Sequence, residues 1–223
     1  MWLLFWPCYL LRYILLERYV PARGYVVIYS FLDEWIPFCE WFLIPYVLWY
    51  GLLIGTHLYL LFHDRKGFRM YSRFLTVATA IATGIFLLYP SCQQLRPEAF
   101  DRDNMLTALV GILYGLDTNT NVLPSEHVIG AVAVILAVTD LQGTGKWLVV
   151  ILSALSGIAT VFLKQHSVLD VVAAVPVCAV AWKLSFGRGV GAYGRKQSYH
   201  HTQSAEFGPI AVDPHDRTML PPG

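Results

Sequence analysis

Two short stretches of the chain carry residues that can do phosphoryl chemistry. The first is Pro124-Ser125-Glu126-His127, directly before an apolar run over 128–138. This order predicts that Ser125 and His127 lie at the first turn of a helix, where free N–H groups and the helix dipole attract an anion. Ser125 can cap the helix and His127 can carry a proton, which makes the stretch a candidate phosphate site. The alternatives are a plain helix cap and a solvated histidine.

The second stretch, Lys164 to Asp170, places a histidine and a carboxylate four residues apart. On a helix, the carboxylate of Asp170 lies one turn from the His166 ring and accepts a hydrogen bond from one ring nitrogen. The other nitrogen is then oriented to attack, and a histidine can form a covalent phosphoryl intermediate. Asp170 also lies in an apolar segment, where an ionisable group is a functional candidate. The alternative is a structural ion pair of Asp170 with Lys164 or Arg96.

The composition of the 223-residue chain is that of a membrane protein, with 56% hydrophobic residues and a mean hydropathy of +0.52. A net charge of +1 and the lack of a nucleic-acid motif leave the lipid bilayer, not nucleic acid, as the expected partner. The four cysteines lie far apart without metal-ligand spacing, so free thiols are expected, with a Cys39–Cys92 disulfide as the alternative. No carboxylate cluster suits magnesium, and no metal or cofactor is expected.

Six apolar segments are long enough to be interpreted as membrane-spanning helices. They cover residues 2–19, 36–62, 74–89, 122–138, 147–163 and 167–186. Arg12 near the middle of the first segment is costly in hydrocarbon, so an interfacial helix is the alternative there. Residues 105–116 have apolar side chains at helical spacing and are expected to lie on the membrane surface. The prediction is an all-α transmembrane domain over 1–187 and a polar, disordered cytoplasmic tail over 188–223.

The charge distribution predicts which ends of the helices face outward. The connection over 63–73 carries the densest basic cluster between spans, Arg65, Lys66, Arg69 and Arg73. The positive-inside rule makes this connection cytoplasmic. With six spans, both chain ends are then cytoplasmic and the two histidine stretches lie on the same outer side. His127 and His166 are therefore expected to meet at one extracytoplasmic site.

Pro124-Ser125-x-His127 followed by His166-x-x-x-Asp170 resembles the second and third signature motifs of the type 2 phosphatidic acid phosphatase (PAP2) superfamily. The resemblance implies the helical core of that superfamily and a metal-independent reaction through a phosphohistidine. In it, His166 attacks phosphorus and Asp170 holds its ring. His127 protonates the leaving oxygen and then deprotonates the incoming water or alcohol.

The phosphate-binding residues that this resemblance implies depart from the usual pattern. Arg96-Pro97 resembles the end of the first motif, but Tyr89 stands where the superfamily has a lysine. Ala159 and Thr160 stand where the third motif has Ser-Arg, so two of the three usual cations are missing. Lys164 is expected to replace one of them, with snorkelling at the membrane surface as its alternative role. The predicted substrate-binding residues are Arg96, Asn121, Ser125, Thr160 and Lys164.

These departures resemble a PAP2 branch related to the aureobasidin-resistance inositolphosphotransferases, over roughly residues 5–186. Further segments of the likeness begin at Asp33, Ile44 and Tyr114. The branch includes lipid phosphatases and enzymes that pass a phospho-headgroup to an alcohol. The first hypothesis is hydrolysis of a lipid phosphate or pyrophosphate, such as phosphatidic acid or an isoprenyl diphosphate. Headgroup transfer is the second and a non-catalytic lipid-binding protein the third, in each case in a bacterial plasma membrane.

Overall fold

The structure is a computed structural model that describes residues 4–19, 24–139 and 143–186. Nearly all of these residues belong to one unit, Met1–Ser185. The tail expected over 188–223 lies outside the described residues. In chain order the elements are α1 (Phe5–Tyr19), β1 (Val26–Val27), α2 (Leu32–Trp35), η2 (Glu40–Phe42), α3 (Leu43–His63), α4 (Arg65–Leu88), β2 (Ser91–Cys92), α5 (Met105–Leu116), α6 (Glu126–Val138), α7 (Gly145–Phe162) and α8 (Val168–Phe186).

The described residues are mostly helical, which confirms the all-α fold class; strands β1 and β2 pair in parallel over only two residues each. Among these residues, four helical segments are long and apolar enough to cross a membrane: η2 with α3, then α4, α7 and α8. The two other expected spans form shorter helices, α1 with 15 residues and α6 with 13. At 1.5 Å per residue α6 is about 20 Å long, less than a hydrocarbon core of about 30 Å.

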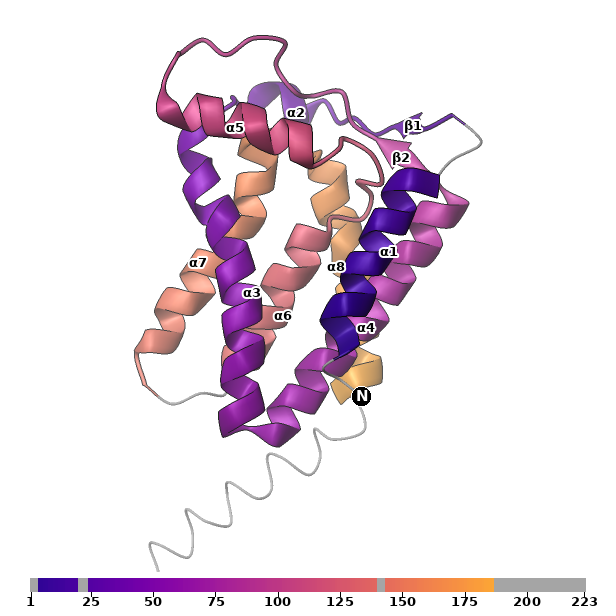
Figure 1. Cartoon of the computed structure of the whole chain (residues 1–223), viewed down its shortest axis with the longest axis vertical. Coiled ribbons are helices and arrows are strands. Elements are labelled where there is room, and N and C mark those ends of the chain that lie inside the picture. The colour runs from indigo at the N-terminus through magenta and orange to yellow at the C-terminus, as the bar shows by residue number, and fades with distance from the viewer. Residues whose placement is uncertain (1–3, 20–23, 140–142, 187–223) are drawn as a thin grey trace, which may run out of the picture. The chain divides into compact units, whose positions relative to one another are not determined.

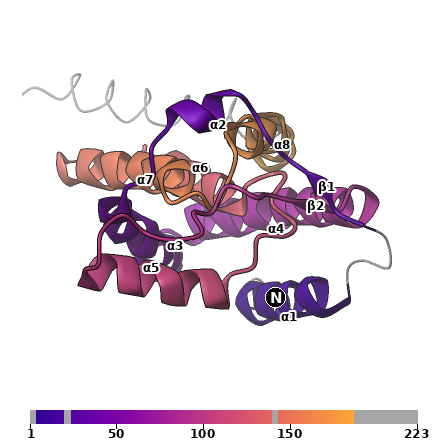
Figure 2. The same cartoon turned by 90° about the horizontal axis from the view of Figure 1, so that it is seen from above.

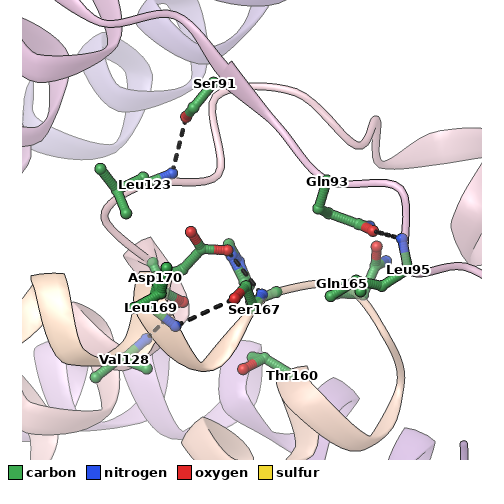
Figure 3. Close-up of polar contacts among 12 residues, drawn as sticks. Ser91, Gln93, Leu95, Leu123, Val128, Thr160, Gln165, Ser167, Leu169 and Asp170 are labelled. Carbon is green, nitrogen blue, oxygen red and sulfur yellow. Dashed lines mark hydrogen bonds and ion pairs between the residues drawn. The ribbon is translucent and has the colours of Figure 1, made fainter. Parts of the chain in front are cut away.

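Helix α6 begins at Glu126 and not at residue 122 as expected, because the preceding segment is bonded to β2. The N–H of Asn121 donates to the Ser91 carbonyl at 2.6 Å, and the N–H of Leu123 donates to the Ser91 hydroxyl at 3.1 Å (Figure 3). Asn121 has a φ of 53°, and the peptide bond before Pro124 is cis. The two hydrogen bonds to Ser91 hold residues 121–125 in a loop that leads directly into α6.

The expected loop over 63–73 is wrong, because only Asp64 separates α3 from α4. The Asp64 carboxylate accepts the N–H of Lys66 at 3.0 Å and so caps α4 at its first turn. Gly67 makes this close turn feasible, since a Cβ there would lie 2.4 Å from Asp64 Oδ2. The basic cluster consequently lies on the first turns of α4.

Helices α3 and α6 pack against each other, and each of them also packs against α4 and α7. Helix α5 lies across the end where α3 begins and α7 ends (Figure 1). Helix α5 has the expected bounds, with a capping box between Asn104 and Thr107. Seen from above, α1 stands at the edge of this group (Figure 2). One cluster of buried hydrophobic residues joins α5, through Val110, to Leu43, Tyr46, Ala159 and Leu163.

The four cysteines are free thiols, so the alternative of a Cys39–Cys92 disulfide is wrong. Cys92 lies in β2, and burial raises the pKa of its thiol. Cys39 precedes η2, and its N–H donates to the Phe162 carbonyl at 3.1 Å. This bond ties the start of one candidate span to the end of α7.

Candidate active site

A backbone hydrogen bond joins the two predicted motifs. The N–H of Ser125, the N-cap of α6, donates to the carbonyl of Asp170 in the first turn of α8 at 3.1 Å. The Ser125 hydroxyl accepts the N–H of Val128 at 3.4 Å, and Ser125 and Asp170 are both fully buried. The N-termini of α6 and α8 therefore meet at one place.

His166 lies in the turn between α7 and α8, in the connection expected between the spans over 147–163 and 167–186. Its spacing of four residues from Asp170 is therefore not that of one continuous helix. The N–H groups of Gln165 and His166 both donate to the Thr160 carbonyl, at 2.9 and 3.1 Å. Asp170 Oδ2 lies 3.2 Å from His166 Nδ1. The same oxygen accepts the N–H of Ser167 at 2.8 Å (Figure 3). The carboxylate thus engages Nδ1, which leaves Nε2 as the ring nitrogen available to a substrate.

Asp33 in α2 holds this turn from the other side. One carboxylate oxygen accepts the Ser167 hydroxyl at 2.6 Å and the N–H of Ser30 at 2.8 Å, and the other accepts the N–H of Val168 at 2.8 Å. The side chain is only 1% exposed. Asp33 therefore caps α8 from a distant part of the chain, a role that its place in a polar connection did not reveal.

His127 lies in a buried aromatic setting. Its ring stacks on Tyr46 and on Trp49, with centroid distances of 4.2 Å in each case. The Trp49 indole N–H donates to the His127 carbonyl at 2.8 Å. Gly130, one turn along α6, permits this approach, because a Cβ there would lie 2.5 Å from the Trp49 ring. The ring of His127 is thus fixed, and its Nε2 has no hydrogen-bond partner among the described residues.

A cavity of about 490 Å³ has both histidines in its wall. Their ring centroids are 6.4 Å apart, close enough for one phosphoryl group to contact both. The cavity is bounded by α1, α3, α4, α5 and α6 and by the loops before α6 and α8. Its apolar lining includes Leu10, Leu16, Phe86, Leu113 and Leu116. It therefore offers a reactive polar end beside a wall suited to hydrocarbon.

Of the predicted substrate-binding residues, Asn121 lies in the cavity wall and Ser125 does not. Neither the amide oxygen nor the amide nitrogen of Asn121 has a hydrogen-bond partner within the described ranges. A ligand that offers both a donor and an acceptor can satisfy them. The hydroxyl of Ser125 is engaged with the start of α6, so Ser125 shapes the site through its cap.

Lys164, Thr160 and Arg96 are not brought to the cavity wall. The Lys164 ammonium donates to the carbonyls of Asp33 at 2.7 Å and Ile36 at 2.5 Å, and burial lowers its pKa. The Thr160 hydroxyl donates to the Gly157 carbonyl at 2.7 Å. Lys164 faces α2 because its φ of 53° turns the chain there, away from the helical path on which it and Thr160 were expected to share a face.

Arg96 organises the rim of the cavity. Its guanidinium donates to the carbonyls of Tyr114, Asp117 and Thr118, at 3.0, 2.8 and 2.9 Å, and to the side chain of Gln165. Burial lowers the pKa of Arg96 despite the opposing effect of the Asp117 carboxylate. The side chain joins the end of α5 to the turn that carries His166, so it orders the segments around the site.

Two carboxylates in the cavity wall were missed as site residues. Glu126 forms a double ion pair with Arg12 of α1, with N–O distances of 2.6 Å, and accepts the Tyr9 hydroxyl at 2.9 Å. Asp117 accepts the Tyr46 hydroxyl at 2.9 Å and the Tyr13 hydroxyl at 3.2 Å. Arg12 in an apolar segment and Glu126 beside His127 were signals, but their sequence separation of 114 hid the pairing.

The geometry provides the parts of a nucleophilic and acid–base site. His166 has an orienting carboxylate, His127 has an unengaged ring nitrogen, and the two rings share a cavity. Such a constellation can attack an electrophilic centre and transfer a proton to the group that leaves. Comparisons of this chain with protein-family models, with curated proteins and with solved structures find no match.

Proposed function

We propose that the chain is a membrane lipid phosphatase of the PAP2 type, which hydrolyses a lipid phosphate or pyrophosphate through a phosphohistidine. The observation that carries this proposal is the shared cavity of His127 and His166, with Asp170 on Nδ1 of His166. Phosphoryl transfer needs positioning more than covalent machinery, and the fixed rings supply it. His127, His166 and Asp170 are the proposed catalytic residues.

The proposed reaction has two steps. In the first, Nε2 of His166 attacks phosphorus, the bond from phosphorus to the lipid oxygen breaks, and His127 gives its proton to that oxygen. In the second, His127 takes a proton from a water whose oxygen attacks phosphorus, and the bond from phosphorus to His166 breaks to release phosphate. Asp170 holds the His166 ring and stabilises its positive charge throughout.

The lining of the cavity supports a lipid as the substrate. The reactive histidines stand beside Leu10 and Leu16 of α1 and Leu113 and Leu116 of α5. A phosphate at the histidines can therefore extend its hydrocarbon along these side chains, which removes apolar surface from water. A small soluble phosphate ester gains nothing from this wall.

We place the site at the outer face of a six-span arrangement in which α1 and α6 are the two short members. The basic cluster begins at Arg65, and the positive-inside rule assigns that end of α4 to the cytoplasm. Helix α4 has 24 residues, which at 1.5 Å each separates its ends by about 36 Å. Ser91 of β2, just beyond the far end, bonds the loop that leads to His127, which supports an extracytoplasmic site, in our proposal that of a bacterial plasma membrane.

Transfer of the phospho-headgroup to an alcohol is the second candidate. The side chain of Asn121 favours it, because a buried amide with both functions unpaired in the described structure can hold an acceptor hydroxyl. In this reaction the alcohol takes the place of water in the second step, and the same residues act. A non-catalytic lipid-binding protein is the third candidate, and it predicts no product at all.

The test is release of phosphate by purified protein from a panel of lipid phosphates and pyrophosphates in the presence of a chelator. Wild-type protein is expected to release phosphate and the His166→Ala variant to release none. If neither protein releases phosphate, incubation with candidate alcohols decides between transfer, seen as a new phospholipid that depends on the acceptor, and a non-catalytic role. Equal release by both proteins would show that His166 is not the nucleophile.

A further inference from the structure

Arg12 is the only lysine or arginine in the cavity wall among the described residues. Its Nη atoms donate to Glu126, and one of them also donates to the Thr83 hydroxyl of α4 at 2.9 Å. The Arg12 and Glu126 side chains are 18% and 16% exposed. A cation that is costly in hydrocarbon thus lies at the polar end of the cavity, which explains why α1 can carry it.

The partner of Arg12 stands where a phosphate would be bound. Glu126 is the first residue of α6 and directly precedes His127, so its carboxylate lies at the helix end that attracts anions. A carboxylate and a phosphate present the same pair of oxygens to a guanidinium fork. The two anions therefore compete for Arg12, and an unpaired Glu126 would repel a phosphate.

The Nε atom of Arg12 provides a second, independent sign. It is buried and has no hydrogen-bond partner among the described residues, so the guanidinium keeps an unused donor. Of the other cations expected near the site, Lys164 donates to the carbonyls of two residues and Arg96 to those of three. The Nε atom of Arg96 is also buried without a partner among the described residues, but Arg96 does not line the cavity. Among the described residues, Arg12 is therefore the one guanidinium that both lines the cavity and keeps an unpaired donor.

We propose that Arg12 binds the phosphate group of the substrate and that Glu126 holds the guanidinium in place until the phosphate displaces the carboxylate. The inference rests on the proposed function in placing a lipid phosphate at the two histidines. It assigns to α1 the positive charge that Tyr89 and Thr160 do not supply. Glu126 then acts as a competitor, so it sets the affinity for the substrate.

The competition predicts opposite effects for the two partners of the ion pair. Arg12→Gln should weaken binding of an anionic lipid by about tenfold to a hundredfold, the usual worth of a hydrogen bond to a charged group. Glu126→Gln should strengthen binding, because the guanidinium is released. A merely structural ion pair predicts that either loss disturbs the cavity in the same direction.

The probe is dodecylphosphonate, whose carbon–phosphorus bond the proposed reaction cannot break. Its affinity is measured by titration calorimetry with the purified full chain in uncharged detergent. Arg102→Gln is the matched control, since Arg102 pairs with Glu40 at 3.0 Å and lies outside the cavity wall. The affinity of Arg102→Gln for dodecylphosphonate should equal that of the wild type. If Arg12→Gln fails to fold, two other variants provide the test. Arg12→Lys keeps the charge but loses the guanidinium fork, so it should bind the phosphonate more weakly than the wild type. Glu126→Gln should bind it more strongly.

Wild-type affinity in Arg12→Gln, weaker binding in Glu126→Gln, or no binding by the wild type would each overturn the inference. A second assay measures hydrolysis of a lipid phosphate by the wild type and by His166→Ala. It distinguishes a failure of this inference from a failure of the proposed function. Arg12-dependent phosphonate binding without His166-dependent hydrolysis upholds the inference and refutes the phosphatase. If hydrolysis depends on His166 but Arg12→Gln binds the phosphonate as tightly as the wild type, the phosphatase is supported and the inference about Arg12 is refuted.

Discussion

Replacing Asp33 with asparagine should destabilise the protein through the start of α8. The carboxylate accepts hydrogen bonds from Ser30, Ser167 and Val168, and the side chain is 1% exposed. An amide keeps one acceptor oxygen and turns an NH2 group toward a donor. About one or two of the three bonds are then lost, and each buried group left unpaired costs about 1–3 kcal/mol. The expected loss is about 2–4 kcal/mol, or a fall in melting temperature of about 5–15 °C for a chain of this size.

The same substitution should lower turnover, because Ser167 also donates to Asp170, which holds the His166 ring. The expected pattern is a fall in kcat with KM nearly unchanged, since Asp33 does not line the cavity. Melting is followed by circular dichroism in detergent, and turnover by phosphate release. Asp64→Asn is the control: Asp64 caps α4 through Lys66, and asparagine is an equally good cap. If Asp33→Asn and Asp64→Asn have the same melting temperature and Asp33→Asn keeps its kcat, the proposed role of Asp33 at the start of α8 is refuted.

Three other substitutions test the site. Asp170→Asn should reduce turnover about a thousandfold or more while the protein still inserts, as expected when the orienting carboxylate of a catalytic histidine is lost; normal turnover would remove Asp170 from the mechanism. Gly130→Ala should displace Trp49, which lowers the stability by about 1–3 kcal/mol and also lowers kcat. Gly157→Ala is the control, because a Cβ there meets its nearest neighbour at 3.8 Å. In the same melting and turnover assays it should be neutral or stabilising. Lys164→Ala should lower the melting temperature and leave the affinity for dodecylphosphonate unchanged, because its ammonium holds α2; weaker binding would return Lys164 to the phosphate site.

Features set by neighbouring residues could be predicted from the sequence. Helix α5 has its expected bounds because Asn104 and Thr107 form a local capping box. The approach of His166 to Asp170 follows from a spacing of four residues, although the turn there is not helical. Short-range hydrogen bonds and periodicity decide both features, so a local pattern is enough.

Features that depend on distant partners could not be predicted. Asp33 meets Ser167 across 134 residues, and Arg12 meets Glu126 across 114. Lys164 was interpreted as a cation for the substrate because nothing near it in the sequence reveals the carbonyls of α2. Whether a charge binds another part of the protein or a ligand depends on tertiary packing, which one sequence pattern does not contain.

The bond between Ser125 and Asp170 bears on how the protein matures during synthesis. The ribosome delivers the segment with His127 long before the segment with His166 and Asp170. Until the first turn of α8 accepts the N–H of Ser125, His127 has neither His166 nor Asp170 beside it. Under the proposed function, nascent chains are therefore expected to be inert toward phosphate esters, and reactivity is expected to arise in a single late step of assembly, when the start of α8 docks against the start of α6.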